Sequence, residues 1–404
     1  MQRIVVIGTG FAGMWSALAA MRLIDLNGGK AAGIEVTVVS PEPTLVIRPR
    51  LYEPDAKSMS APLEDLFRVT GIQFVKGTVE TICVPQRLVK IVDQAGVCST
   101  LSYDRLVLAA GSHLRRPNIP GLREHSFSID QIGEAAEFEA HLHSLAARPP
   151  SPARNTVVIG GGGFTGIEIA AELPSRLRSI LGQDAEVRVV IIEQATEIGP
   201  ELGANPRPVI VQALAEQGVE TKLGEAVMSV DDKGVVTTSG ERIDSLTVLW
   251  TAGVEATPLT QQIPGVKDKL GRLHVDADLR VPSAKEIFVA GDAALAETDN
   301  NGHYAMMSCQ HALRLGRFAG HNAAADLLNV AAKPYSQPTY GTCLDLGPWG
   351  AVVTEGWERT VRFKASVAKP IKENINRVVI YPPSANRAEA FAAADPECPG
   401  PVLT

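Results

Sequence analysis

Hydrophobic and polar positions follow the same order in two separate parts of the chain, and the first copy lies at the N-terminus. The apolar run 3–8 predicts a buried strand, and residues 9–13 form a glycine turn. Small and apolar residues over 14–26 then predict a helix, and a second apolar run predicts a strand over 34–40. This order is that of a βαβ unit, whose two strands are parallel.

The second copy repeats this order in the middle of the chain. A strand is predicted over 156–160, a glycine turn over 161–166, a helix over 167–181 and a returning strand over 187–193. Two βαβ units a domain length apart predict an α/β fold with two Rossmann-like dinucleotide-binding domains.

The segments outside the two units predict the remaining organisation. The proline-containing segments 117–121 and 147–152 are typical of crossovers between domains, and the second would fit a domain boundary. A buried strand with a polar end is predicted over 287–292, followed by a helix over 307–328.

The pattern changes after residue 330. Short strands are expected first, then a polar helix over 364–376, and the Pro- and Ala-rich residues 392–404 are expected to form a loose tail. The chain therefore predicts a small C-terminal α+β segment.

The first glycine turn has the complete GxGxxG spacing, with Gly8, Gly10 and Gly13. The first glycine makes the tight turn, the second lets the backbone approach a pyrophosphate, and the third lets helix and strand pack closely. The free N–H groups at the start of the following helix can donate hydrogen bonds to the phosphates and so favour their binding. An acid is expected at the end of the second strand, but this strand ends at Ser40 and Pro41, so Ser40, Glu42 or water could contact the ribose.

In the second turn, only the register of Gly161, Gly163 and Gly166 gives the complete spacing. Here the second strand does end in an acid, Glu193, which can accept hydrogen bonds from the adenosine ribose. Glu193 would repel a 2′-phosphate, and no arginine follows directly, so the sequence favours NADH over NADPH.

Composition and charge exclude several function classes. The 404 residues are 45% hydrophobic and 21% charged, as in a globular protein of two or three domains. A net charge of −7 provides no basic field for nucleic acid. No apolar run reaches the ~20 residues needed to cross a bilayer, and the N-terminal apolar run is too short for a signal peptide. We therefore expect a cytoplasmic protein.

The five cysteines lack any CxxC or metal-binding spacing, so we expect a reducing compartment and no metal site. Cys309 and Cys343 could meet near a cofactor, although a small buried core residue is the simpler interpretation of each.

The segment Val157–Glu168 resembles the pyridine-nucleotide-dependent flavoprotein reductases of the glutathione reductase type, and most closely the type II NADH dehydrogenases. The resemblance covers about residues 1–355. Segments 103–111 and 248–253 are similar to the two strands that join the FAD and NAD domains of that family, and Pro49–Tyr52 falls where the family has a segment beside the flavin.

The resemblance implies a division of the chain into an FAD domain of residues 1–117 and 271–330, an NAD domain of residues 118–270, and a C-terminal domain of residues 331–404. It also implies roles for single residues: Asp292 would bind the ribityl chain of FAD, and Glu168 and Gln310 would lie at the reacting rings. Burial of Glu168 would raise its pKa.

Together, the motifs and the resemblance predict two sets of binding residues. The FAD set is Gly8, Gly10, Phe11, Ala12, Gly13, Ser40, Glu42, Arg48, Val79, Ala110, Gly111, Asp292 and Cys309. The NAD set is Gly161, Gly163, Phe164, Thr165, Gly166, Glu193 and Gly253.

The electron acceptor is less well defined by the resemblance. Type II NADH dehydrogenases carry an Ala-Gln-x-Ala-x-Gln pattern beside the flavin, whereas the matching run here has Cys309 and Arg314 in place of the first Ala and the second Gln. The C-terminal stretch is also too polar for an interfacial helix. Its charges Lys364, Lys369, Lys372 and Arg377 are expected to be a solvated face, with peripheral docking at the inner face of the membrane as the alternative.

We expect an FAD-dependent NADH dehydrogenase that takes hydride from NADH and passes the electrons to a small acceptor such as a quinone. Two alternatives remain open: a reductase for a protein partner such as a ferredoxin or rubredoxin, and a slow-turnover flavoprotein that senses NADH. The sequence is compatible with a monomer or a homodimer.

Overall fold

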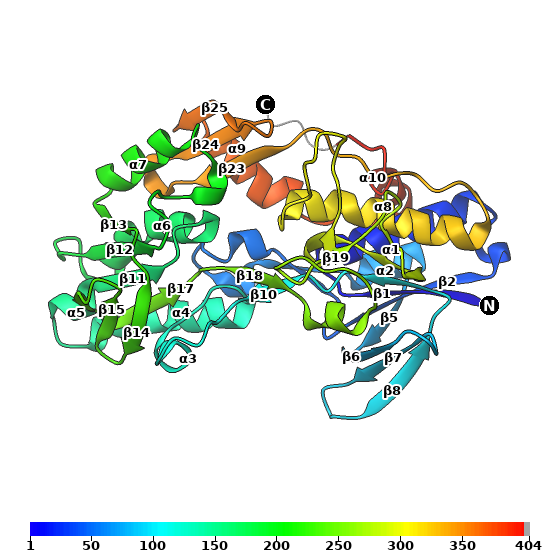
Figure 1. Ribbon diagram of the computed structural model, residues 1–404, viewed down its shortest axis with the longest axis horizontal. Helices are drawn as coiled ribbons and strands as arrows, with labels where there is room; N and C mark the ends of the chain where they lie inside the picture. The colour runs from blue at the N-terminus through cyan, green and yellow to red at the C-terminus, as the bar shows by residue number, and fades with distance from the viewer. Residues whose placement is uncertain (400–404) are drawn as a thin grey trace.

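The computed structural model describes residues 1–399 and shows two lobes side by side, with a third sheet near the C-terminus (Figure 1). The first lobe is built on a six-stranded sheet with the order β20-β21-β9-β1-β2-β5. Its strands are β1 (Gln2–Ile7), β2 (Ile34–Ser40), β5 (Gln73–Lys76), β9 (Arg105–Leu108), β20 (Arg280–Val281) and β21 (Ala284–Val289). All pair in parallel except β20, which is antiparallel to β21.

Helices and a small sheet cover the two faces of this first sheet. Helices α1 (Phe11–Leu26) and α8 (Cys309–Leu328) lie together on one face. The antiparallel sheet of β6 (Thr78–Cys83), β7 (Leu88–Val92) and β8 (Cys98–Ser102) packs its apolar residues against the other face.

Glycines allow α1 and α8 to touch. A Cβ added to Gly316 would lie 2.4 Å from the carbonyl oxygen of Ala12, and one added to Gly320 would lie 1.9 Å from that of Ser16. No side chain would fit between the two helices at these positions. The two glycines therefore let α8 pack directly against α1, the helix that follows the first glycine turn.

The second lobe repeats this arrangement with a four-stranded parallel sheet in the order β13-β12-β11-β17. Its strands are β11 (Thr156–Gly160), β12 (Arg188–Glu193), β13 (Val219–Leu223) and β17 (Thr247–Trp250). Helices α4 (Ile132–Ser144), α6 (Phe164–Leu181) and α7 (Arg207–Glu216) share one core on one face. The antiparallel strands β14 (Val227–Asp231), β15 (Gly234–Thr237) and β16 (Arg242–Asp244) share another core on the opposite face.

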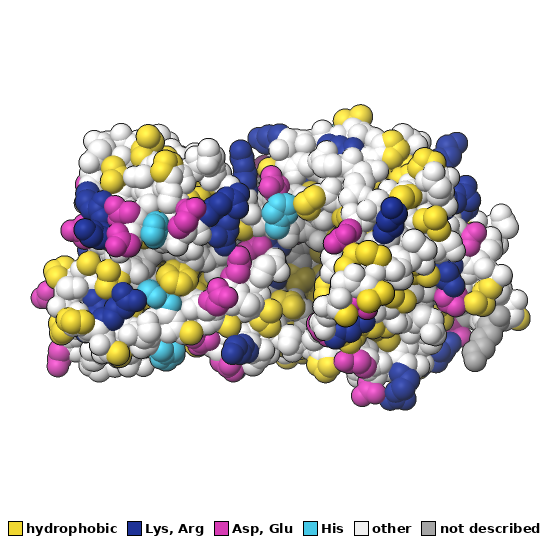
Figure 2. All heavy atoms as spheres, turned by 90° about the horizontal axis from the view of Figure 1, so that it is seen from below, with side chains coloured by type: hydrophobic (Ala, Val, Ile, Leu, Met, Phe, Trp, Pro, Cys, Tyr) yellow, Lys and Arg dark blue, Asp and Glu magenta, His cyan; other side chains and the backbone are white. Residues whose placement is uncertain are grey.

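The two lobes are joined by the antiparallel pair β10 (Ser112–Leu114) and β18 (Val254–Ala256). These strands come directly after β9 and β17, so the connection lies at the carboxyl ends of both parallel sheets. From below, the two lobes meet at a hollow, and acidic and basic side chains are interspersed on this face (Figure 2).

The C-terminal part forms a three-stranded antiparallel sheet of β23 (Gly341–Asp345), β24 (Ala351–Glu355) and β25 (Thr360–Ala365), which lies above the second lobe in Figure 1. Helix α9 (Lys369–Asn374) and the π-helical turn η9 (Ile375–Val379) follow, and α10 (Arg387–Ala393) contacts α1 and α2 (Glu64–Thr70). The remaining short α-helices and β-strands are β3 (Thr44–Val46), β4 (Ser60–Pro62), α3 (Leu122–His125), α5 (Pro152–Asn155), β19 (Leu273–His274) and β22 (Ala294–Leu295).

The parallel sheets confirm the predicted α/β class, and strands 34–40 and 156–160 have the predicted bounds. The predicted boundary at 147–152 is wrong, because α4 before it and β11 after it share one core. The chain also returns to the first lobe before residue 271, since Ile263 packs into the first lobe's core.

The predictions for the C-terminal part need two corrections. The predicted helix over 364–376 is wrong at its start, because Lys364 and Ala365 belong to β25. The predicted loose tail is wrong from Ala392 to Pro399: α10 ends at Ala393, and Asp395 and Glu397 form ion pairs with Arg22 and Lys333. The rest of that segment, 400–404, lies outside the described residues. Between residues 1 and 399, no helix is long and apolar enough to cross a membrane.

Candidate functional site

The first glycine turn joins β1 to α1 and leaves one side of its backbone open. Gly8 has a φ of +106°, and a Cβ there would lie 2.6 Å from the carbonyl oxygen of Ala109. A Cβ on Gly13 would lie 2.0 Å from the carbonyl oxygen of Gly8, whereas a Cβ on Gly10 would meet no atom within 4 Å. Backbone atoms therefore close the turn at Gly8 and Gly13 and leave it open at Gly10, as the binding of a phosphate requires.

Ser40 and Glu42 are the two side chains at the end of β2 that could contact a ribose, and Ser40 is the one that lies against this turn. Its Oγ is 3.0 Å from the Oγ1 of Thr9, and both side chains are buried. The exposed Glu42 carboxylate instead accepts hydrogen bonds from Lys76 and Gln94, and the bond from Lys76 lowers its pKa. Ser40 is thus the side chain placed next to the loop.

A cluster of partly buried polar side chains surrounds Asp292, which follows β21 in the turn Gly291–Ala293. Its Oδ2 accepts a hydrogen bond of 2.6 Å from Ser112, and Nη1 of Arg48 is 3.7 Å away. Arg48 also donates to Asp130. Burial raises the pKa of Asp292. A carboxylate in this position can accept hydrogen bonds from sugar hydroxyls without becoming an unpaired charge.

The other residues predicted for the first cofactor lie in different surroundings. Phe11 and Ala12 open α1, Val79 is buried in the core shared with β1, and Ala110 and Gly111 follow β9. Cys309 is the first residue of α8, and burial raises the pKa of its thiol to about 11. The thiol of Cys309 is therefore neutral at physiological pH.

The second glycine turn has nearly the same backbone. Gly161 has a φ of +113°, a Cβ there would lie 2.9 Å from Ala252, and a Cβ on Gly166 would lie 2.0 Å from the carbonyl oxygen of Gly161. Gly253, which begins the connection back to the first lobe, also has a positive φ of +78°. Thr165 is exposed in the first turn of α6.

Two carboxylates bind the N–H groups of this second turn. The buried Glu193 accepts hydrogen bonds of 2.7 Å from the N–H of Gly162 and 2.8 Å from that of Ala195. Oε1 of Glu201 accepts a hydrogen bond of 3.0 Å from the N–H of Phe164, at the start of α6. No motif in the sequence points to Glu201, because its position depends on how the loop after β12 folds back.

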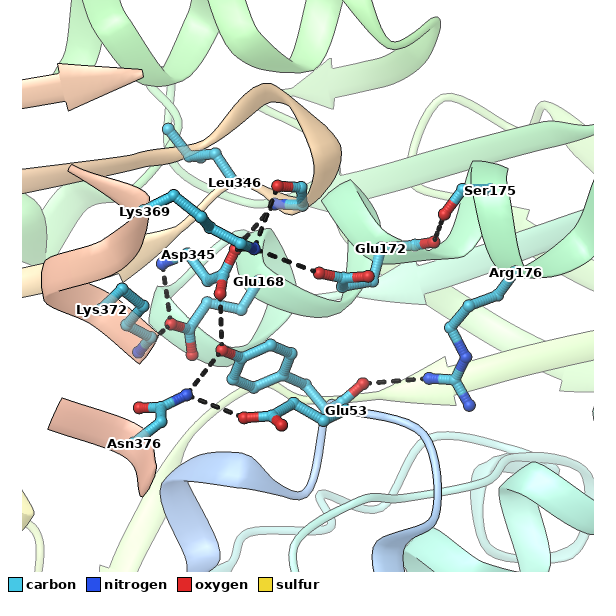
Figure 3. A network of polar contacts seen from close by, with 12 residues as sticks. Glu53, Glu168, Glu172, Ser175, Arg176, Asp345, Leu346, Lys369, Lys372 and Asn376 are labelled. Carbon is cyan, nitrogen blue, oxygen red and sulfur yellow. Dashed lines mark hydrogen bonds and ion pairs between the residues drawn. The ribbon is translucent and has the colours of Figure 1, made fainter. Parts of the chain in front are cut away.

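Glu168 lies two residues beyond Gly166 and is buried inside the protein (Figure 3). Its Oε1 accepts hydrogen bonds of 2.7 Å from Nζ of Lys372 and 2.9 Å from the N–H of Asp345. Burial raises the pKa of Glu168 to about 7, and Lys372 offsets part of that effect. Glu168 can therefore change its protonation state near neutral pH.

The lysines near the C-terminus correct a prediction. Lys369 and Lys372 were expected on a solvated face, but Lys372 is buried and Lys369 donates a hydrogen bond of 2.6 Å to Asp345. Burial alone would lower the pKa of Lys372, but Glu168 and Asp345 raise it above its usual value. Lys364 and Arg377 do remain exposed.

The polar contacts continue from Asp345 toward the first lobe, as Figure 3 shows. Tyr52 donates a hydrogen bond of 2.9 Å to Asp345, and Asn376 donates to both Tyr52 and Glu53. Burial raises the pKa of Tyr52 well above its usual range, so it stays protonated. Glu168 is thus linked through hydrogen bonds to Glu53, whose side chain is partly exposed.

The start of α8 lies beside a stack of aromatic rings. Gln310 accepts a long hydrogen bond of 3.4 Å from the N–H of Gly341. The next residue, His311, stacks on Tyr340 at 4.9 Å, Tyr340 on Trp357 at 5.0 Å, and Trp357 on His303 at 4.4 Å. His311 is fully buried, and its Nε2 has no hydrogen-bond partner among residues 1–399.

Arg314, which departs from the family pattern, donates to the carbonyl oxygen of Ser336. Across the described part of the chain, no three His, Cys, Asp or Glu side chains are grouped so that they could hold a metal ion.

The family model for pyridine nucleotide-disulphide oxidoreductases matches residues 2–316. An NADH dehydrogenase-like protein of Mycobacterium tuberculosis is 44% identical over 399 residues, covering 98% of each chain. The demethylphylloquinone reductase of Synechocystis is 28% identical over 87% of this chain and 86% of its own length.

Two solved structures share the fold. The NDH2 structure from Plasmodium falciparum, determined with NADH, has a TM-score of 0.76 at 15% identity and covers 97% of each chain. The sulfide:quinone oxidoreductase of Aquifex aeolicus has a TM-score of 0.76 at 20% identity, and the match covers 97% of this chain and 94% of that one.

Proposed function

The chain belongs to the pyridine nucleotide-disulphide oxidoreductase family, and from this premise we propose that it is an FAD-dependent NADH dehydrogenase that reduces a quinone-type acceptor. The observation that carries the proposal is the pair of glycine turns, one in each lobe, together with the buried carboxylate of Glu168 on the helix after the second turn. The similarity to an NADH dehydrogenase-like protein over nearly the whole chain supports it.

We assign FAD to the first lobe. The open side of Gly10 and the first turn of α1 fit a pyrophosphate, and Ser40 next to the loop fits the adenosine ribose. Asp292, with Ser112 and Arg48 beside it, fits the ribityl hydroxyls. The FAD domain then comprises residues 1–117 and the return segment that continues through residue 330.

We assign NADH to the second lobe, within residues 118–270. Glu193 already holds the N–H of Gly162, so its carboxylate is fixed at the end of β12 where an adenosine ribose is recognised. A 2′-phosphate at this place would meet a buried negative charge. The assignment therefore predicts a preference for NADH over NADPH.

Bound FAD supplies the chemistry of accepting hydride from NADH and passing two electrons to the acceptor. The protein's part is to orient the rings, exclude water and handle the proton. Glu168 holds a proton at its carboxyl near neutral pH, and Lys372 and the N–H of Asp345 fix the orientation of that carboxyl. The hydrogen bonds among Asp345, Tyr52 and Asn376 hold the surroundings of Glu168 in place as far as Glu53.

We place the acceptor at the start of α8, with Gln310 as the residue that contacts the reacting rings. The aromatic stack beside it, whose partly exposed rings are Trp357 and His303, offers a flat surface for a quinone ring. The side chain of Arg314 donates a hydrogen bond to the carbonyl oxygen of Ser336. We therefore do not assign Arg314 the contact with the acceptor that the family's second glutamine would make. Relatives named as quinone reductases support a quinone.

We further propose a cytoplasmic enzyme that contacts the inner face of the membrane peripherally. The exposed side chains Val367 and Val378, at 67% and 65%, are close in sequence to the exposed Lys364 and Arg377. Two apolar side chains beside basic ones suit a weak contact with an anionic surface.

The acceptor can be identified by reoxidation. The purified yellow protein is first reduced with NADH without oxygen, and then mixed in a stopped-flow instrument with a soluble naphthoquinone or with ferredoxin or rubredoxin. The proposal predicts fast recovery of the flavin absorbance with the quinone. Recovery only with the protein acceptor would replace the quinone by a redox protein, and the absence of any NADH reduction would contradict both enzyme functions.

A further inference from the structure

The loop after β12 places a carboxylate where the second glycine turn would receive phosphates. We propose that Glu201 competes with the pyrophosphate of NADH for the start of α6, and so weakens nucleotide binding and promotes the release of NAD⁺. This inference rests on the proposed assignment of NADH to the second lobe.

The backbone holds Glu201 in this position. It lies in the turn Pro200–Leu202, whose Leu202 is buried at 2% exposure. The preceding Gly199 donates a hydrogen bond of 2.9 Å to the carbonyl oxygen of Gly162, within the glycine turn itself. A backbone hydrogen bond and the buried side chain of Leu202 therefore hold the loop against the glycine turn. The fold of the loop places the Glu201 carboxylate at the start of α6.

The Glu201 carboxylate occupies two places that a bound pyrophosphate would use, the free N–H at the start of α6 and the open side of Gly163. It accepts the hydrogen bond from the N–H of Phe164, at the positive end of the 18-residue helix α6. Its Oε1 also lies 2.5 Å from the point where a Cβ on Gly163 would be, on the side that this glycine leaves open. A pyrophosphate uses the same N–H groups and the same glycine, and two negative groups cannot share them.

Among residues 1–399, no carboxylate competes in this way at the first glycine turn. No atom lies within 4 Å of a Cβ position on Gly10, and among the described residues no side chain accepts a hydrogen bond from the N–H of Phe11. FAD remains bound through many turnovers, whereas NAD⁺ has to leave after each one. A carboxylate that replaces the leaving phosphates keeps the N–H of Phe164 bonded and favours exchange at the second turn only.

The test measures binding without catalysis. Equilibrium dissociation constants of ADP-ribose, which carries the pyrophosphate but no nicotinamide, are measured by calorimetry on the oxidised FAD-loaded protein. Adenosine, which lacks phosphate, is the control ligand. Glu201→Gln removes the charge, and Glu201→Ala removes the whole competing group.

Glu197→Gln is the matched control variant, because Glu197 lies on the same loop, is 59% exposed and pairs with Arg207 instead of the glycine turn. We expect both Glu201 variants to bind ADP-ribose about 3- to 10-fold more tightly, as for the loss of one competing charged hydrogen bond. Glu197→Gln should bind as the wild type does, and adenosine should bind equally to all.

Unchanged or weaker ADP-ribose binding in both Glu201 variants would overturn the inference, and so would an equal gain in Glu197→Gln. No binding of ADP-ribose by any variant would overturn it together with the NADH assignment. Reduction of the wild-type flavin by NADH tests the proposed function separately, because it does not depend on what Glu201 does.

Discussion

The two glycine turns have almost the same backbone but different surroundings. Gly8 and Gly161 share a positive φ, and Gly13 and Gly166 each lie against the carbonyl oxygen of the first glycine of their own turn. At the first turn, the neutral side chain of Ser40 contacts Thr9. Around the second, the carboxylates of Glu193 and Glu201 hold the loop N–H groups.

The helices after the two turns also differ in whether they carry a titratable side chain at matching buried positions. Trp15 stands two residues after Gly13, is buried, and lies under the guanidinium of Arg317 at 4.3 Å. The equivalent position after Gly166 is Glu168, which brings a titratable group into the centre of the protein. On the proposed assignment, the backbone of each turn provides for phosphate binding, and the side chains around it set whether the ligand stays bound or reacts and leaves.

The largest expected effect comes from changing the first glycine of each turn to alanine. Both changes force a residue with Cβ into a positive φ, which costs about 1–3 kcal/mol, and both create a close contact. We expect Gly8→Ala to lose FAD and to be purified colourless or aggregated. We expect Gly161→Ala to remain yellow but to bind NADH too weakly for reduction, as measured by the absorbance of bound flavin before and after NADH.

The opposite pattern, with Gly161→Ala colourless and Gly8→Ala yellow, would show that the assignment of the two cofactors is reversed. Equal loss of flavin in both variants would show that the two turns are not independent.

The next effect concerns the proton held by Glu168. Its pKa near 7 means that the carboxyl is protonated below that pH and charged above it. Since quinone reduction consumes protons, turnover in the wild type should fall as the pH rises through about 7. Glu168→Gln should lower kcat about 100-fold and remove this inflection, as expected for the loss of a general acid.

Glu172→Gln is the control for this prediction, because Glu172 lies one turn further along α6 and faces Lys369 rather than Lys372. It should keep the pH profile of the wild type. A Glu168→Gln enzyme that keeps both its rate and the inflection near pH 7 would show that another group supplies the proton.

The smallest effect is one of nucleotide preference. Glu193→Gln should reduce the preference for NADH over NADPH, measured as the ratio of kcat/KM values, about tenfold, because a 2′-phosphate no longer meets a carboxylate. Glu42→Gln, the matching change in the first lobe, should leave this ratio unchanged, because the exposed Glu42 bonds to Lys76 and Gln94. An unchanged ratio in Glu193→Gln would remove Glu193 from the ribose site.

The sequence was sufficient where structure depends on neighbours in the chain. The bounds of β2 and β11 and the positions of Gly161 and Gly166 follow from hydrophobic runs and glycine spacing over a few residues. The buried position of Lys372 could not be found in this way, because its partner Glu168 lies 204 residues away in the chain. A lysine-rich stretch is normally solvated, and only the folded arrangement of α9 against α6 supplies the buried carboxylate that overrides this tendency.

The central claim is that the first turn holds a resident FAD and the second an exchangeable NADH. It is tested most directly by a titration of the purified protein with NADH in the absence of oxygen, followed by the visible absorbance of the flavin. The account predicts about one FAD per chain, no bound nicotinamide after purification, and complete bleaching by about one equivalent of NADH. A colourless protein, or a yellow one whose absorbance NADH does not change, would contradict it.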